Sequence, residues 1–167
     1  MNSWVDSNCR KDSPYLSEAS TIFDMGWDRK IFLGPGESSH SRVSQKGFTN
    51  HADLHRTGLW ACQFAIIKHF DIMYDTFRKK RKTLALKLIS GKGKGYRHNS
   101  HHMDQFMSLV DIVRAFLGKS NIYYFEDNIG VFSIPKSSLH RLFLIWNQKG
   151  FICSPKSFSQ KFVDPRL

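Results

Sequence analysis

The stretch Met103–Phe162, MDQFMSLVDIVRAFLGKSNIYYFEDNIGVFSIPKSSLHRLFLIWNQKGFICSPKSFSQKF, has the clearest structural pattern in the chain. Its first part predicts a helix, because apolar residues recur there at the spacing of one helical face. These residues are Phe106, Leu109, Val110, Val113 and Leu117. Asp104 fits the first turn of this helix, and Gly118 fits a left-handed C-terminal cap. We therefore expect a helix that ends near residue 118.

A β-hairpin is predicted next. Ile122–Phe125 and Val131–Ile134 are two β-prone runs, and residues 126–128 between them are Glu, Asp and Asn. Asp and Asn tolerate the positive φ angles that a tight turn requires. Pro135 ends the second strand, because proline has no N–H group to donate to a sheet.

A second helix is predicted after the hairpin. Ser137 is a suitable N-cap, and Gly150 marks the end of the helix. One apolar face contains Leu139, Leu142, Phe143 and Trp146. The whole stretch is thus expected to fold as helix, hairpin and helix.

Upstream of this stretch the pattern is weaker. Residues 1–57 are rich in Ser, Gly, Pro, Asn and His, which predicts an N-terminal arm or extension, partly irregular. Residues 58–167 are predicted to form an α+β nucleic-acid-binding domain. Gly58–Phe70 is densely apolar and should be core. We expect a short helix or turn that leads into a strand at Gln63–Ile67, followed at Asp71–Phe77 by a turn or the continuation of that strand. A further strand is expected within Thr83–Ile89.

The overall composition indicates a globular, strongly basic protein. The 167 residues include 41% hydrophobic and 14% aromatic residues, which is enough for the core of one domain. The net charge is +11. A surplus of this size points to a polyanionic partner, most often nucleic acid and less often an anionic membrane surface.

Three cysteines, Cys9, Cys62 and Cys153, are widely spaced and form no C-x-x-C pair. Neither a zinc site nor a disulfide framework is indicated, so a reducing intracellular compartment, such as the nucleus or an organelle (mitochondrion or chloroplast), is expected. No run of about 18 apolar residues is present, so no transmembrane segment is expected.

Most of the positive charge is concentrated between Phe77 and Met103, where no acidic residue occurs. The basic residues of this segment are Arg78, Lys79, Lys80, Arg81, Lys82, Lys87, Lys92, Lys94 and Arg97. Together with Lys119 they are the candidate nucleic-acid-binding residues. Two basic groups at the ends of one strand would line a sheet edge and suit a phosphate backbone. The alternatives are a solvated charged loop and a localisation signal.

Several segments of the chain are similar to one protein family. Residues 116–124, FLGKSNIYY, resemble the fLG-x-G-x-I-y-y segment of LAGLIDADG homing endonucleases. Residues 131–136, VFSIPK, followed by Leu139 and Leu142, resemble that family's fourth strand and the helix after it. Residues 154–157, SPKS, resemble its pL-x-t-x-K stretch. The resemblance covers roughly residues 58–162 and is most specific over 116–136.

The resemblance implies an α+β fold with an antiparallel sheet, helices packed on one face, and a saddle that lies on duplex DNA. In that family a short helix ends in an acid that carries Mg²⁺ for phosphodiester hydrolysis, and one motif per chain implies a homodimer. Residues 58–66, GLWACQFAI, resemble the motif without its acids, since no Asp or Glu occurs between Asp53 and Asp71. Asp53 and Asp71, on either side of this segment, are the candidate substitutes for the missing acid. Lys136 matches a basic residue near the family's active site.

Three functions remain open at this point. The favoured one is a duplex-DNA-binding protein of the homing-endonuclease type, Mg²⁺-dependent if it cleaves and without a cofactor otherwise. The second is a non-enzymatic RNA-binding, intron-splicing or viral accessory protein, in which Tyr96, Tyr123 and Tyr124 stack on unpaired bases. The third is a matrix-like structural module whose charge faces a membrane or a partner.

Overall fold

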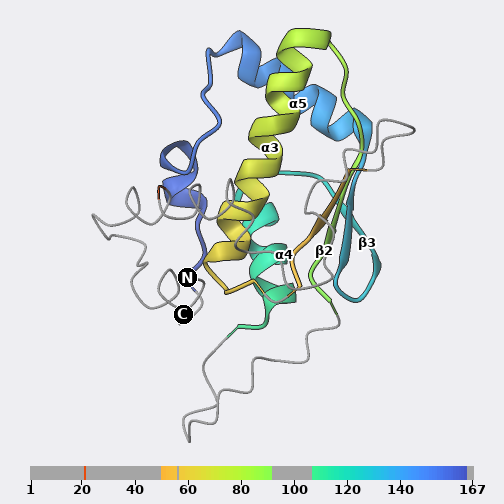
Figure 1. The fold of residues 1–167 in the computed structure, drawn as a ribbon, viewed down its shortest axis with the longest axis vertical. Helices are drawn as coiled ribbons and strands as arrows, with labels where there is room; N and C mark the ends of the chain where they lie inside the picture. The colour runs from red at the N-terminus through yellow and green to blue at the C-terminus, as the bar shows by residue number, and fades with distance from the viewer. Residues whose placement is uncertain (1–20, 22–49, 56, 92–106, 165–167) are drawn as a thin grey trace, which may run out of the picture.

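A computed structural model describes Thr21 and residues 50–55, 57–91 and 107–164 (Figure 1). The elements in chain order are β1 (Asn50–Asp53), α3 (Ala61–Lys80), β2 (Leu86–Ile89), α4 (Leu109–Lys119), β3 (Phe125–Asn128), β4 (Val131–Ile134), α5 (Lys136–Gln148) and the 3-10 helix η1 (Lys156–Lys161).

The strands form one four-stranded sheet in the order β1-β2-β4-β3. This mixed helix and strand content confirms the predicted α+β class. The β2–β4 and β4–β3 pairs are antiparallel as expected, but β1 and β2 are parallel, so the prediction of an antiparallel sheet is wrong for that pair. Parallel neighbours need a crossover, and α3 provides it here. β1 falls within residues 1–57, the predicted arm, and this part of the segment belongs to the sheet.

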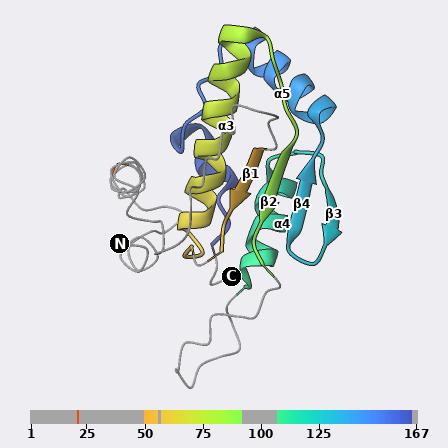
Figure 2. The same cartoon turned by 45° about the vertical axis from the view of Figure 1, so that its right-hand side comes forward.

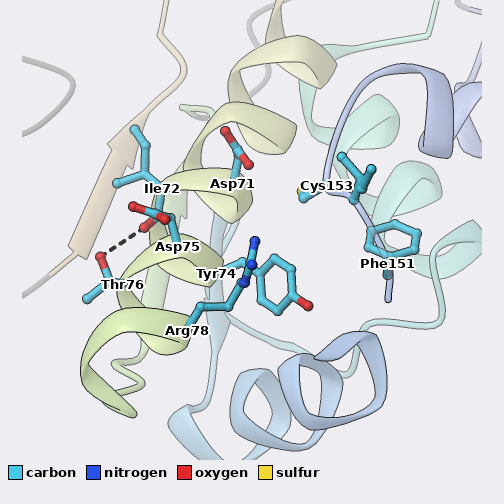
Figure 3. Close-up of a pocket in the computed structure, with 9 residues that line it drawn as sticks. Asp71, Ile72, Tyr74, Asp75, Thr76, Arg78, Phe151 and Cys153 are labelled. Carbon is cyan, nitrogen blue, oxygen red and sulfur yellow. Dashed lines mark hydrogen bonds between the residues drawn. The ribbon is translucent and has the colours of Figure 1, made fainter. Parts of the chain in front are cut away.

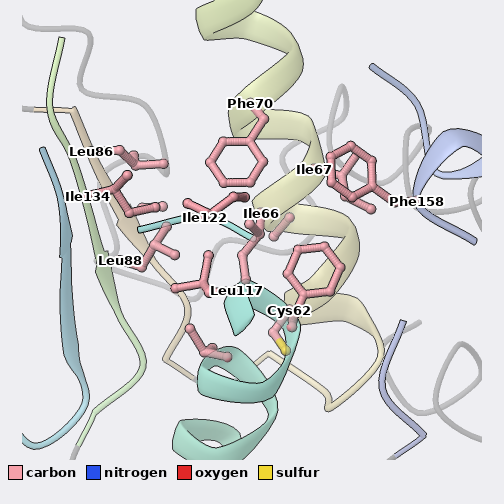
Figure 4. Packing of buried hydrophobic residues seen from close by; sticks show 14 of the residues in the cluster. Cys62, Ile66, Ile67, Phe70, Leu86, Leu88, Leu117, Ile122, Ile134 and Phe158 are labelled. Carbon is pink, nitrogen blue, oxygen red and sulfur yellow. The ribbon is translucent and has the colours of Figure 1, made fainter. Parts of the chain in front are cut away.

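One face of the sheet is buried, and none of the described helices covers the other, which we call the open sheet face. Leu86 and Leu88 of β2 and Phe132 and Ile134 of β4 are fully buried, while the residues alternating with them are half-buried. This alternation follows from the two-residue period of a strand. Helices α3 and α4 cover the buried face, as two views show (Figures 2 and 4).

Residues 61–80 form a single 20-residue helix, so the strand predicted at Gln63–Ile67 and the turn or strand at Asp71–Phe77 are both wrong. The first half of α3 is buried on nearly every side, and its sequence is therefore mostly apolar on all faces of the helix. A continuous apolar run of this kind has no period that separates helix from strand. Only the second half, with Phe70, Met73, Tyr74 and Phe77 buried, shows the spacing of a helix.

The predicted helix–hairpin–helix order is present, with shifted boundaries. Helix α4 begins after Ser108, whose hydroxyl and Asp111 form a capping box. The acid of its first turn is Asp111, so the prediction of Asp104 there is wrong; Asp104 itself lies outside the described residues. Gly118 remains helical, so the cap predicted there is wrong. The left-handed residue is Asn121, at φ 53°.

The hairpin turn also differs from the prediction. β3 runs over Phe125–Asn128, so the first predicted strand overlaps it only at Phe125, and residues 126–128 are strand instead of turn. The turn lies at residues 129–130, with Gly130 at φ 80°. A Cβ atom at Gly130 would lie 1.9 Å from the Gly91 carbonyl oxygen, so only glycine fits there.

The second helix begins earlier than predicted. β4 matches the predicted range, and α5 starts directly after Pro135, so Ser137 lies inside the helix and is not its N-cap. The chain leaves α5 through Gly150, at φ 62°, near where its end was predicted.

The C-terminal segment is fastened to α3 by aromatic packing and by one buried amide. Phe162 packs against Trp60 and Phe64, with ring centroids 5.8 and 5.2 Å apart. The fully buried Gln63 side chain donates to the Val163 carbonyl at 2.9 Å and accepts from the Val163 N–H at 2.8 Å. This amide thus satisfies both backbone groups of Val163.

Replacing Gln63 by leucine should destabilise the fold by about 2–4 kcal/mol, because two backbone groups of a buried residue lose their partners. Urea unfolding followed by circular dichroism measures the change. Gln160→Leu is the matched control, since Gln160 is exposed in η1. Equal unfolding midpoints for the two variants would contradict this role of Gln63.

Candidate nucleic-acid interface

Five consecutive basic residues lie where α3 leaves the core. The buried stripe of the helix ends at Phe77, and Arg78, Lys79 and Lys80 form its last turn, all exposed. Arg81 caps the helix, and Lys82 follows; both are exposed. The residues of this run therefore face solvent at one end of the molecule.

Two of these five cations have a structural partner. Lys79 forms an ion pair with Asp75 at 2.7 Å, one turn back. Arg81 adopts a left-handed conformation (φ 51°), donates its N–H to the Phe77 carbonyl, and places its guanidinium 5.5 Å from the centre of the Phe77 ring. Arg78, Lys80 and Lys82 form no ion pair with any acid among the described residues.

The helix dipole alone does not account for this charge. Cations in the last turn stabilise a helix by about 0.3–1 kcal/mol each at low salt. Successive like charges repel one another, however, and Lys82 lies beyond the helix. The run therefore provides positive charge in excess of what α3 requires.

Helix α5 brings a further cation to this end. The Thr83 hydroxyl lies 3.1 Å from His140 Nδ1, and the His140 ring packs edge-on against Phe77. Lys136 begins the same helix, one turn before His140, and is exposed. We call Arg78–Lys82 together with Lys136 the basic end.

Two other predicted binding residues, Lys87 and Lys119, lie away from the basic end. Lys87 lies on the open sheet face and pairs with Asp127 at 3.1 Å. Lys119 is exposed at the last residue of α4, which covers the opposite face. Lys92, Lys94 and Arg97 lie outside the described residues, as does Tyr96. The first basic group precedes β2 as predicted, but it belongs to the end of a helix.

The two candidate catalytic residues lie far apart, Lys136 at the start of α5 and Asp71 of α3 near the segment that follows the end of α5. Asp71 of α3 lines a shallow groove of about 330 Å³ together with Phe151 and Cys153, which follow α5 (Figure 3). Lys136 is the first residue of α5, whose 13 residues span about 20 Å. The structure therefore does not bring Asp71 and Lys136 together.

The thiol in the groove beside Asp71 is not activated. Burial, and to a lesser extent the nearby Asp71 carboxylate, raises the pKa of the Cys153 thiol above its ordinary value. A thiol whose pKa is raised stays protonated and is a poor nucleophile. Cys153 is therefore expected to be inert.

The residues that the structure describes do not assemble a magnesium site. No three His, Cys, Asp or Glu side chains in this part of the chain lie close enough to hold a metal ion. The short acid-ended helix implied by the resemblance is here the buried first half of α3, and its matching residues 58–66 contain no acid. Mg²⁺-dependent hydrolysis therefore stays a prediction.

Comparison with known proteins found no match. No family model, curated protein or solved structure matches the chain. Within the described residues, none of the helices is both long and apolar enough to cross a membrane. The interpretation of the basic end therefore depends on its own geometry and charge.

Sequence reasoning missed His140 and the position of Phe125. His140 meets Thr83 across 57 residues of sequence, and no spacing in the chain indicates that contact. Phe125 was expected in the first strand of the hairpin, but its exposure on an edge strand was not. An alternation count along Tyr123–Phe125 would have placed residues 123 and 125 on the same side.

Asp127 has a lowered pKa on the open sheet face. The Ser133 hydroxyl donates to its carboxylate at 2.5 Å, and Lys87 lies beside it. The hydrogen bond from Ser133 is the larger cause and Lys87 the smaller; both favour the charged form of Asp127. This carboxylate therefore neutralises the one lysine of β2.

Removing the Ser133 hydroxyl should raise the pKa of Asp127 towards its ordinary value. Because the folded-state pKa is lowered, Asp127 stabilises the fold above its unfolded pKa of about 3.9, and this contribution disappears as the pH falls through the folded value. An NMR pH titration of the Asp127 carboxyl carbon in Ser133→Ala measures the shift. Ser137→Ala is the control, and an unchanged pKa in Ser133→Ala would contradict the assignment.

Proposed function

We propose that this protein binds nucleic acid, with duplex DNA as the favoured ligand, by holding the phosphate backbone at the basic end. The observation that carries the proposal is the exposure of five consecutive cations where α3 leaves the core, three of them without an ion-pair partner among the described residues. Lys136 adds a cation from a different element, so the charge covers a surface and not only one turn of helix.

The physical basis is release of counterions. Each phosphate neutralised by Lys or Arg frees cations that were condensed on the nucleic acid, so binding is strong at low salt and weakens as salt rises. Arg suits this role through its planar donor group, and Lys through its compact charge. Arg78, Lys80 and Lys82 retain these donors for a ligand.

The open sheet face is less suited to the phosphate backbone. The homing-endonuclease resemblance would place duplex DNA on that face. Lys87 is already paired with Asp127 there, and Asp53 of β1 is exposed on the same side. Among the described residues, two carboxylates against one lysine give this face no surplus of positive charge. The charge balance therefore favours the basic end.

We include in the proposal only a partial likeness to the homing-endonuclease fold. Helix, hairpin and helix follow one another over α4, β3, β4 and α5, as that resemblance implies. The long α3, the parallel β1–β2 pair and the missing acids differ from it. We propose binding, and we derive no cleavage step and no dimer.

Substituting two free cations of the basic end should weaken binding selectively. Lys80→Gln/Lys82→Gln should bind a short duplex DNA more weakly, and the slope of log K against log salt should become shallower by about 1.8, since each lost phosphate contact removes about 0.9. Fluorescence anisotropy at several salt concentrations measures both quantities. Neither residue contributes to the core, so the fold should be retained.

Lys149→Gln/Lys156→Gln is the matched control. It removes the same charge from two exposed residues outside the basic end, Lys149 directly after α5 and Lys156 at the start of η1. Equal losses in the two double variants would show that net charge alone drives binding. No binding by the wild-type protein at low salt would disprove the proposed function.

A further inference from the structure

Two aromatic rings stand exposed side by side before and within β3. Tyr123 is 68% exposed and Phe125 is 47% exposed, with ring centroids 6.5 Å apart in a T-shaped arrangement. Tyr124 between them is half-buried and packs against Phe132. This follows from alternation along an extended chain, which sends residues 123 and 125 to one side and 124 to the other. The exposed pair adds little to the core.

The aromatic pair lies next to the start of α5. The Ser138 hydroxyl donates to the Tyr123 carbonyl at 3.2 Å. His140, two residues further along the same helix, meets Thr83 at 3.1 Å. The first turns of α5 therefore lie between the aromatic pair and the segment that carries Arg81 and Lys82.

Both acids of β3 are neutralised from within the protein. Asp127 is paired with Lys87 at 3.1 Å, and Glu126 with Arg114 of α4 at 3.1 Å. The Glu126 carboxylate also accepts from the Gly130 N–H at 3.2 Å. These partners remove much of the repulsion that a phosphate would otherwise meet near the rings. Lys136, in contrast, has no ion-pair partner among the described residues.

We propose that Tyr123 and Phe125 form a stacking site for an unpaired base of the nucleic acid held by the basic end. Every base has a flat π face that stacks on an aromatic ring irrespective of sequence, and flanking cations bind the backbone. Charge complementarity favours this occupant over an apolar peptide, because the exposed Lys136 lies two residues before Ser138, whose hydroxyl contacts the Tyr123 backbone. The inference rests on the proposed function and adds a ligand class: nucleic acid with a single-stranded stretch.

Comparison of a blunt DNA duplex with the same duplex carrying a short single-stranded extension tests the site. Wild-type protein should bind the extended duplex about tenfold more tightly, as expected for one stacked base. Tyr123→Ala/Phe125→Ala should lose this preference and bind the blunt duplex as before. Tyr123→Phe should keep it. The same duplex with an RNA extension in place of the DNA extension shows whether the site takes unpaired bases from RNA, from DNA or from both.

Two controls separate stacking from other effects. An extension with abasic residues keeps the phosphates and should lose the preference in the wild-type protein. Ile129→Ala removes another exposed apolar side chain of the hairpin, 70% exposed, and should leave the preference intact. Circular dichroism and the urea midpoint establish that the alanine variants are folded.

The outcomes distinguish this inference from the proposed function. Equal affinity of the wild-type protein for abasic and base-bearing extensions overturns the stacking site, while binding of the blunt duplex leaves the proposed function standing. A preference that survives in Tyr123→Ala/Phe125→Ala also overturns it. Failure of the wild-type protein to bind either ligand at low salt overturns both.

Discussion

The structure depends on the burial of one helix. Twelve of the 20 residues of α3 are buried, and the sheet, α4, α5 and the C-terminal segment all pack around it. Transfer of so much apolar surface from water is the dominant stabilising term for a chain of this size. Because the buried stripe ends at Phe77, the cations that follow have no core to cover and must face solvent. The basic end is thus a direct consequence of where α3 leaves the core.

The part of the fold that the sequence predicts well has periodic apolar residues. Helices α4 and α5 and strand β4 were found because their buried residues recur at helical or alternating spacing. The first half of α3 was missed because seven consecutive buried residues, 61–67, have no period. The parallel β1–β2 pair was missed for the same reason. Parallel neighbours need a crossover connection, and α3 is the crossover between these two strands. The caps predicted at Gly118 and Ser137 shifted by three and two residues, to Asn121 and Pro135, because the backbone geometry decides among nearby candidates.

The sequence predicted which residues of the candidate site are basic, but not how those residues are arranged in space. The run of cations at 78–82 is plain in the sequence, and its solvent exposure fits that reading. Which cations remain free is a tertiary property: Lys87 is neutralised by Asp127 from another strand, and no local pattern reveals it. The same holds for the distance between Asp71 and Lys136, which depends on how α5 lies against α3. Tyr123 is exposed, as a stacking residue would need to be, but its neighbour on that side is Phe125, because Tyr124 packs inwards.

NMR chemical-shift mapping with a short DNA duplex tests the central claim most directly. Titration of the isotope-labelled protein should shift the backbone amides of residues 78–83 and of the first turns of α5 most strongly, with smaller changes elsewhere. The shifts should reverse as salt is added, because the contacts are ionic. Shifts confined to the open sheet face around Lys87, or to residues 149–156, would contradict the assignment of the basic end as the nucleic-acid interface.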